Sequence, residues 1–299
     1  MASIKRDYKS SMFCMLWENK EELLSLYNAT SGMNYTNADD LIINTLRNAI
    51  YMGMKNDVSF IVEMSLNLYE HQSTVNPNMP LRDLLYVAKV LQGMVKDENL
   101  YSSALVKIPT PKFVVFYNGT AKQPERQMLR LSDSFSKQTG EVNLELVVEV
   151  LNINPGNNEK LLNNCKTLRE YVMYVERVRT YLADMPVEQA VNRAVDECIR
   201  EGILADFLSR NKAEAIEVSI FEYNQEAHMN SVRQEGYEDG RADGTIQTIE
   251  FFVLEYLEDG IPAERIAEKL MRGFAMTKEQ AEETVERYKK WVRCENSTN

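Results

Sequence analysis

Two acidic residues, Asp57 and Glu70, lie near the ends of two neighbouring apolar runs. The runs DVSFIVEM and LNLYEHQS are short and rich in Val, Ile, Phe, Leu and Tyr, which is typical of strands. If a hairpin joins these strands, the two carboxylates come close together. Carboxylates that face one point attract a hard cation such as Mg²⁺ or Mn²⁺. Such an ion polarises a phosphoryl oxygen and activates a bound water, which then attacks phosphorus.

The residues that follow Glu70 extend this pattern. Gln72 is two positions further on, and side chains alternate along a strand, so Glu70 and Gln72 share one face while His71 points to the other. The backbone carbonyl of His71 could complete a metal shell. The alternative is that Asp57 and Glu70 are solvated or turn-forming groups at strand ends. For the His71 side chain, an exposed or hydrogen-bonded structural role is favoured over a catalytic base.

Several other chemistries are excluded by missing motifs. The sequence has no G-x-x-x-x-G-K-[ST] phosphate loop and no G-x-G-x-x-G, which argues against ATP use and against a nucleotide cofactor. No nucleophile-elbow pattern is present. The cysteines form no C-x-x-C pair, so we expect reduced thiols rather than a zinc or redox site, at Cys14, Cys165, Cys198 and Cys294.

Composition indicates a protein with a sizeable core and an acidic surface. The chain has 299 residues, 44% hydrophobic residues and a net charge of −11. Such a charge is not typical of a non-specific nucleic-acid coat, although a local basic groove would still permit DNA binding. No apolar run reaches the length of a membrane span, and the N-terminus has no signal-peptide core. We therefore expect a cytoplasmic protein without membrane contact.

Strands and helices alternate over the first part of the chain. Periodicity predicts helices over 12–32, 80–98 and 157–182, with Pro80 in a favourable first turn. The run Phe113–Tyr117 predicts a buried central strand, and a further strand is expected over 144–154. This interleaving predicts an α/β fold with a mixed sheet flanked by helices.

The chain after about residue 185 is predicted to be wholly helical. Gly236, Gly240 and Gly244 recur every four residues, which would place them on one helix face or form a soft linker. The linker is favoured because each Gly costs about 1 kcal/mol in a helix. Thr277, with Gln280 three positions later, matches a capping box at the start of the last helix.

Three segments together resemble a known family: NDVSFIV, LYEHQSTVNPNMPLRDLLYVAKV and IPTPKFVVFYNGT. They are similar to the recombination-promoting nuclease (Rpn) family, also labelled transposases, within the PD-(D/E)XK nuclease superfamily. The resemblance covers roughly residues 5–235. It implies a restriction-endonuclease-like core, with a four-stranded mixed sheet between helices and a helical C-terminal extension. The corresponding domains are a core over 1–185, a helical part over 186–235 and the extension over 236–299.

The resemblance also implies an activity, the Mg²⁺- or Mn²⁺-dependent endonucleolytic hydrolysis of DNA. Asp57 and Glu70 match the family's acidic residues, and Gln72 takes the position of the superfamily lysine. The metal would be held by Asp57, Glu70 and the His71 carbonyl, while Gln72 would orient water or a phosphate oxygen. The sequence departs from the family at Ser10, where members often carry Asp. A first-helix acid would then come from one of Glu18, Glu21 and Glu22.

The proposed partner, DNA, requires positive charge near these acids. The candidates for DNA binding are Arg82, Lys89 and Lys112, with further cations at Lys9, Lys107 and Lys122. The C-terminal helices predict a homo-oligomer. An alternative function is a catalytically weak or inactive nuclease-fold protein that acts through oligomerisation or through DNA or protein binding.

Overall fold

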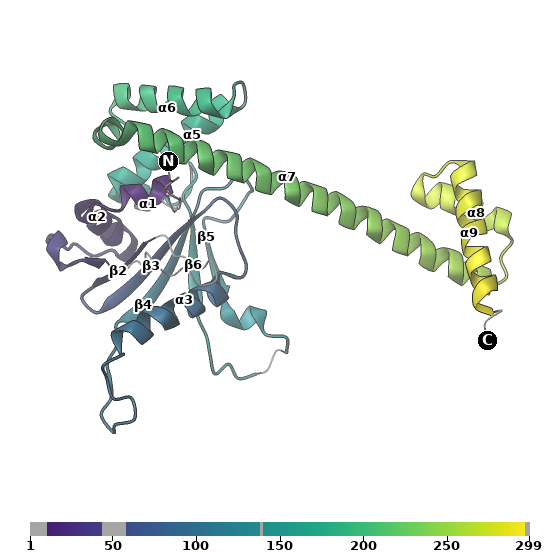
Figure 1. The fold of residues 1–299 in the computed structure, drawn as a ribbon, viewed down its shortest axis with the longest axis horizontal. Coiled ribbons are helices and arrows are strands. Elements are labelled where there is room, and N and C mark those ends of the chain that lie inside the picture. The colour runs from purple at the N-terminus through teal and green to yellow at the C-terminus, as the bar shows by residue number, and fades with distance from the viewer. Residues whose placement is uncertain (1–10, 44–57, 138–139, 297–299) are drawn as a thin grey trace, which may run out of the picture. The chain divides into compact units, whose positions relative to one another are not determined.

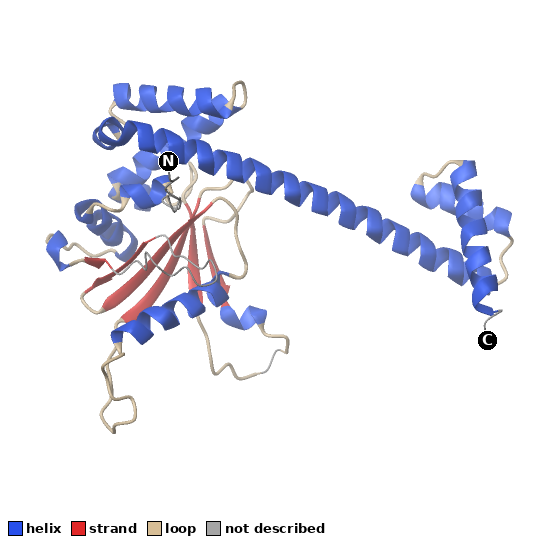
Figure 2. Ribbon diagram, in the orientation of Figure 1, coloured by secondary structure: helices blue, strands red, loops and turns tan. Residues whose placement is uncertain are grey.

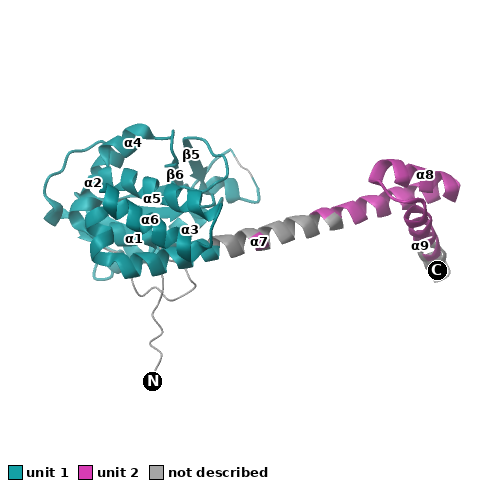
Figure 3. Ribbon diagram, turned by 90° about the horizontal axis from the view of Figure 1, so that it is seen from above, with its two compact units in different colours: residues 1–226 teal, residues 227–299 magenta. Residues whose placement is uncertain are grey.

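The computed structural model describes residues 11–43, 58–137 and 140–296. It is an α/β structure in which six strands form one mixed sheet flanked by helices (Figures 1 and 2). The chain divides into two compact units, Met1–Glu226 and Ala227–Asn299 (Figure 3). The mixed sheet and its flanking helices agree with the alternation of elements predicted from sequence.

The sheet has the strand order β1-β2-β3-β4-β6-β5. Strands β3, β4 and β6 are parallel at its centre, whereas the β1–β2, β2–β3 and β5–β6 pairs are antiparallel. The resemblance implied four strands, and the edges add two short ones, β1 and β5. The strands are β1 (Ile42–Ile43), β2 (Val58–Val62), β3 (Ser65–Gln72), β4 (Thr110–Tyr117), β5 (Arg126–Arg130) and β6 (Val147–Asn152).

Two of the long predicted helices are each split in two. The first break lies just before Asn19, which caps the next helix: its side chain accepts a hydrogen bond from the Glu22 N–H. Cys165, with an extended backbone, makes the second break. The helices of the first unit are α1 (Met12–Leu16), α2 (Lys20–Ser31), α3 (Met79–Met94), α4 (Glu159–Asn164), α5 (Lys166–Leu182), α6 (Val187–Glu201) and the start of α7 (Ala205–Glu258), with 3₁₀ turns η1 (Ala38–Asp40) and η2 (Leu131–Ser134).

Each face of the sheet carries its own hydrophobic core. On one face, Tyr69 of β3 and Phe116 of β4 pack in a cluster with residues of α1, α2 and α5. On the other face, Leu66 and Leu68 of β3 pack with Tyr86 of α3. Figure 2 shows α3 on the opposite side of the sheet from α1 and α2. We call these the α5 face and the α3 face.

The second unit contains the end of α7, α8 (Ala263–Phe274) and α9 (Lys278–Asn296), which share a small core. The predicted capping box is confirmed: the Thr277 N–H donates to Gln280 Oε1 at 2.9 Å, and the Gln280 N–H donates to Thr277 Oγ1 at 3.3 Å.

The linker predicted around the three glycines is wrong, because the backbone of α7 is helical through Gly236, Gly240 and Gly244. Packing at each end of the helix gives a physical reason. Val218 is buried in the first unit and Val253 in the second, and these contacts offset the roughly 1 kcal/mol that each glycine costs.

Candidate functional site

The carboxyl end of β3 places two polar side chains on the α3 face. Leu66 and Leu68 of this strand are buried against α3, and side chains alternate along the strand. Glu70 and Gln72 therefore lie on the α3 face as well, which agrees with a hydrogen bond from Gln72 Nε2 to Glu70 Oε1 at 3.4 Å.

Glu70 is nearly buried, with 8% of its surface exposed. Arg82, at the start of α3, donates from Nη2 to Glu70 Oε1 at 2.9 Å. Gln72 Nε2 and Arg82 Nη1 also approach the sulfur of Met79, at 2.8 and 3.2 Å. Glu70, Gln72 and Arg82 thus form one cluster between β3 and the first turns of α3, which we call the Glu70 cluster.

One atom of this cluster lacks a hydrogen bond. Gln72 Oε1 is buried, and no described residue donates to it. A buried carbonyl oxygen without a donor costs about 1–3 kcal/mol, so such atoms are rare in folded proteins. This oxygen is chemically suited to a water molecule or a hard cation.

The second predicted acid, Asp57, lies outside the described residues. The described hairpin ends at the pair formed by Val58 and Tyr69. The Asn118 N–H donates to the Gln72 carbonyl at 3.1 Å, on the side of β4. Successive carbonyls along a strand point to opposite sides, so the His71 carbonyl points toward the β2 side of β3.

The His71 side chain lies on the α5 face, away from Glu70. Its ring stacks on Phe13 with centroids 5.1 Å apart, and its Nε2 is 3.0 Å from the Tyr171 hydroxyl. Burial of the ring lowers the pKa of His71 to about 4, and the charge of Arg179 acts in the same direction. The ring is therefore neutral at neutral pH. The ring is thus hydrogen-bonded rather than exposed, which is one of the two structural roles that the sequence favours for His71.

A second carboxyl on the α3 face, Asp83, was missed by the sequence analysis. It is only 4% exposed, and burial raises its pKa to about 7, with Arg82 opposing the shift. The signal was present in the sequence: Asp83 falls at helical spacing with Met79, Tyr86 and Val87, the apolar side of the helix.

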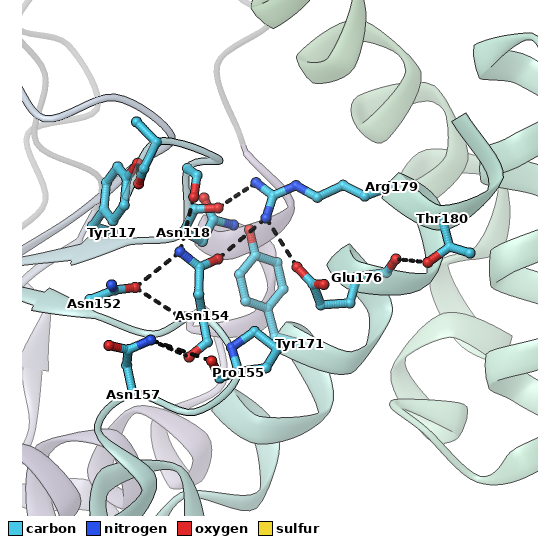
Figure 4. Close-up of polar contacts among 12 residues, drawn as sticks. Tyr117, Asn118, Asn152, Asn154, Pro155, Asn157, Tyr171, Glu176, Arg179 and Thr180 are labelled. Carbon is cyan, nitrogen blue, oxygen red and sulfur yellow. Dashed lines mark hydrogen bonds and ion pairs between the residues drawn. The ribbon is translucent and has the colours of Figure 1, made fainter. Parts of the chain in front are cut away.

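The ends of β4 and β6 are joined to α5 through Arg179 (Figure 4). Arg179 donates to the Asn118 carbonyl, to Glu176 Oε1 at 3.2 Å and to Asn154 Oδ1 at 3.4 Å. Asn154 in turn donates from Nδ2 to the Gly119 carbonyl at 2.9 Å and to Asn152 Oδ1 at 3.0 Å. These bonds fix the end of the sheet where the carboxyl ends of β3, β4 and β6 lie.

Gly119 explains why the turn after β4 carries Asn-Gly. A Cβ atom at this position would lie 1.7 Å from the carbonyl oxygen of Ser73, just after β3. Only glycine permits this close approach of two backbones. The contact holds the turn after β4 against the backbone of Ser73, the residue that follows Gln72.

The predicted DNA-binding residues do not all lie at the Glu70 cluster. Arg82 belongs to it. Lys89 is exposed two turns further along α3, about 10 Å away along the helix axis. Lys112 is exposed at the start of β4 and alternates with Phe113 of the α3 face, so it belongs to the α5 face. The structure therefore brings Arg82 to Glu70, but not Lys112.

The acids of the first helices have other neighbours. Glu22 accepts a hydrogen bond from the Thr167 hydroxyl. Glu18 and Glu22 line a hollow of about 550 Å³ with residues at the starts of α5 and α7, among them Lys166 and Arg210. Ser10 lies outside the described residues.

No group of three or more His, Cys, Asp or Glu side chains that could hold a metal ion occurs within residues 11–43, 58–137 and 140–296. Within the same ranges, no helix combines the length and apolar composition needed to cross a bilayer. Comparisons with protein-family models, with curated proteins and with solved structures give no match to this chain.

Proposed function

We propose that the chain is a metal-dependent DNA endonuclease with a PD-(D/E)XK-like core, of the recombination-promoting nuclease or transposase type. The Glu70 cluster carries this proposal. A nearly buried carboxylate lies on the same strand face as a buried amide oxygen that no described residue donates to. The Gln72 oxygen is costly to bury unless a ligand completes it, and a carboxylate that can bind the same cation lies beside it.

The donor atoms fit Mg²⁺ or Mn²⁺, which prefer oxygen ligands. Glu70 and the His71 carbonyl would hold the ion together with Asp57, whose part rests on the sequence pattern alone. Mg²⁺ usually keeps several waters and takes only one or two carboxylates, so this set is sufficient. When bound, the ion polarises a phosphoryl oxygen and lowers the pKa of a bound water.

The other residues of the cluster would position the reactants. Gln72 donates its amide N–H to Glu70, and its Oε1 accepts a hydrogen bond from the attacking water. Arg82 supplies the positive charge that glutamine lacks at the position of the superfamily lysine, and this charge stabilises the phosphorane. Lys89, on the same helix, would contact a DNA phosphate.

Nicking of supercoiled plasmid tests the proposal. With Mg²⁺ or Mn²⁺ the wild type should cut, and with EDTA it should not. Asp57→Ala and Glu70→Ala should lose cleavage while keeping native circular dichroism and melting. Glu149→Ala is a matched control, because Glu149 is a sheet carboxylate paired with Arg126 at 3.0 Å outside the cluster. Equal cutting by wild type and both site variants would mean contamination and would end the proposal.

One observation favours a second function, that of a nuclease-fold protein that works through oligomerisation or DNA or protein binding. Arg82 already neutralises Glu70 at 2.9 Å, so the buried carboxylate has a partner without any metal ion. Wild type that binds DNA and sediments as an oligomer without cutting in Mg²⁺ or Mn²⁺ would support this function. A catalytic chain should instead cut under the same conditions.

We also propose that the protein works in the cytoplasm on DNA during recombination or transposition. Cys165 and Cys198 are free thiols, which is the usual state in a reducing compartment. Recombination frequency in cells that express wild type or Glu70→Ala would test this role. Equal frequencies would contradict it.

A further inference from the structure

Arg82 occupies the position that a cation would take beside Glu70. Its Nη2 lies 2.9 Å from Glu70 Oε1, a normal distance for a charge-assisted hydrogen bond. The two side chains differ in exposure: 35% of the Arg82 side chain is exposed, against 10% of that of Glu70. The carboxylate is fixed inside, and the guanidinium reaches it from the solvent side.

We propose that Arg82 exchanges partners during the reaction. It pairs with Glu70 while no metal is bound, and it moves to a DNA phosphate when a divalent cation binds Glu70. This inference rests on the proposed function, and it adds that metal binding and DNA contact are coupled through one side chain.

The exchange follows from electrostatics. The two carboxylates of the proposed metal site, Glu70 and Asp57, neutralise two positive charges, whereas a divalent cation and a guanidinium together bring three. At distances of about 4 Å two unit charges of the same sign repel strongly even near a protein surface. Gln72 is neutral and adds no negative charge to offset this. Arg82 therefore leaves Glu70 when the cation arrives.

The surroundings of Arg82 favour an anion as its second partner. Among the described residues, the partner of its Nη1 is the sulfur of Met79, a weak acceptor that is easily given up. The first turn of α3 carries no acidic side chain, and Asp83, which follows Arg82, is buried, so neither presents an exposed carboxylate to an incoming phosphate. The planar guanidinium binds phosphate oxygens through two parallel hydrogen bonds.

Another ion pair on the same sheet provides a matched control. Arg126 Nη1 lies 3.0 Å from Glu149 Oε1, but these side chains are 63% and 27% exposed. An exposed pair of this kind is worth little and has no buried carboxylate to give to a metal. Arg126→Gln should therefore change neither metal affinity nor DNA affinity.

Calorimetric titration with Mn²⁺ tests the first half of the exchange. Arg82→Gln keeps a polar partner for Glu70 but removes the competing charge, so the Kd for Mn²⁺ should fall roughly tenfold, the equivalent of one charge-assisted hydrogen bond. Glu70→Gln should abolish binding. The melting temperature with and without Mn²⁺ gives a second readout, because a ligand that binds more tightly stabilises the folded state more.

Fluorescence anisotropy with a short labelled DNA duplex tests the second half. In EDTA, wild type and Arg82→Gln should bind the duplex equally, because Arg82 is held by Glu70. Ca²⁺ replaces Mn²⁺ in this assay so that binding is measured without cleavage. In Ca²⁺, Arg82→Gln should bind the duplex roughly tenfold more weakly than wild type.

Each contrary outcome has a distinct meaning. If Arg82→Gln weakens DNA binding equally in EDTA and Ca²⁺, Arg82 is a permanent phosphate contact and the exchange is wrong. If its Mn²⁺ affinity is unchanged or lower, Arg82 does not compete with the metal and the exchange is also wrong. If wild type itself binds no Mn²⁺, the proposed nuclease function fails first, and the exchange fails with it.

Discussion

The two faces of β3 bury polar side chains in different ways. On the α5 face, the Tyr69 hydroxyl lies 2.6 Å from the Thr30 hydroxyl, and His71 pairs with Tyr171. On the α3 face, Glu70 pairs with a half-exposed arginine, and Gln72 keeps a buried oxygen that no described residue donates to. Both faces leave a buried oxygen without a described donor, because Asn67 Oδ1, opposite Phe60 of β2, lies on the α5 face. The α3 face differs in that it also buries a charged group, the Glu70 carboxylate, and costly burial of this kind concentrates at functional sites.

The largest expected difference between the faces is in cleavage. Glu70→Gln keeps the size of the side chain but removes the charge that holds a metal, so plasmid nicking should fall at least about 100-fold, a loss of roughly 3 kcal/mol. Tyr171→Phe, on the α5 face, should nick as wild type does. If both variants lost cleavage equally, the assignment of chemistry to the α3 face would be wrong.

The next difference is in stability. His71→Ala removes the stack on Phe13 and the hydrogen bond to Tyr171 and leaves a cavity, so the free energy of unfolding should fall by about 2–4 kcal/mol. Gln72→Ala should cost less than about 1 kcal/mol, because it also removes an oxygen without a donor. Urea unfolding at pH 8 measures both. A larger loss for Gln72→Ala would contradict the comparison.

The pH dependence of stability should also have opposite signs on the two faces. Asp83 has a folded-state pKa of about 7, above its ordinary value, so the folded state binds the extra proton and stability falls as pH rises from about 4 to 7. His71 has a folded-state pKa of about 4, below its ordinary value, so stability falls as pH drops from about 6.5 to 4. The two slopes overlap and largely cancel in the wild type.

Two substitutions separate these slopes. Asp83→Asn should show stability that rises between about pH 4 and 6.5, by up to about 1.4 kcal/mol per pH unit. His71→Phe should show stability that falls over about pH 4 to 7. Urea midpoints across this range measure both. Identical pH profiles for both variants and wild type would show that neither group titrates as described.

A further small effect is expected for Tyr171→Phe on stability. It removes one buried hydrogen bond, at 3.0 Å to His71 Nε2, and should cost about 1 kcal/mol. The melting temperature should fall by about 2–4 °C. No measurable change would mean that the polar pairs of the α5 face contribute little to stability.

The central part of the fold could be predicted from sequence. The strand-forming runs at β2, β3, β4 and β6 are short, apolar and bounded by polar or turn residues, and the structure has strands there. Strand β5 was missed because its sequence, RQMLR, has two charged residues and lies at the sheet edge, where packing rather than composition decides pairing. The helix breaks near Asn19 and Cys165 were missed because apolar spacing continues across them.

The candidate site was predictable only in part. Alternation along a strand was sufficient to place Glu70 and Gln72 together and His71 opposite them. The ion pair between Arg82 and Glu70 could not be predicted, because sequence distance does not show which side chain a helix turns toward a strand. Asp83 was missed although its spacing from Met79 and Tyr86 places it on the apolar side of α3. The role of Asp57 as a metal ligand stays a prediction.

The chain distances within these contacts bear on how the protein folds. Arg82 and Glu70 are 12 positions apart, whereas Tyr171 and His71 are 100 apart. Closing the longer loop costs about 2 kcal/mol more in chain entropy. A nascent chain can therefore dock the first turns of α3 onto β3 early, whereas the α5 face is covered only after α5 has been synthesised. Chains truncated or stalled before α5 would keep the ion pair between Arg82 and Glu70 and would expose the rings of Phe13 and His71.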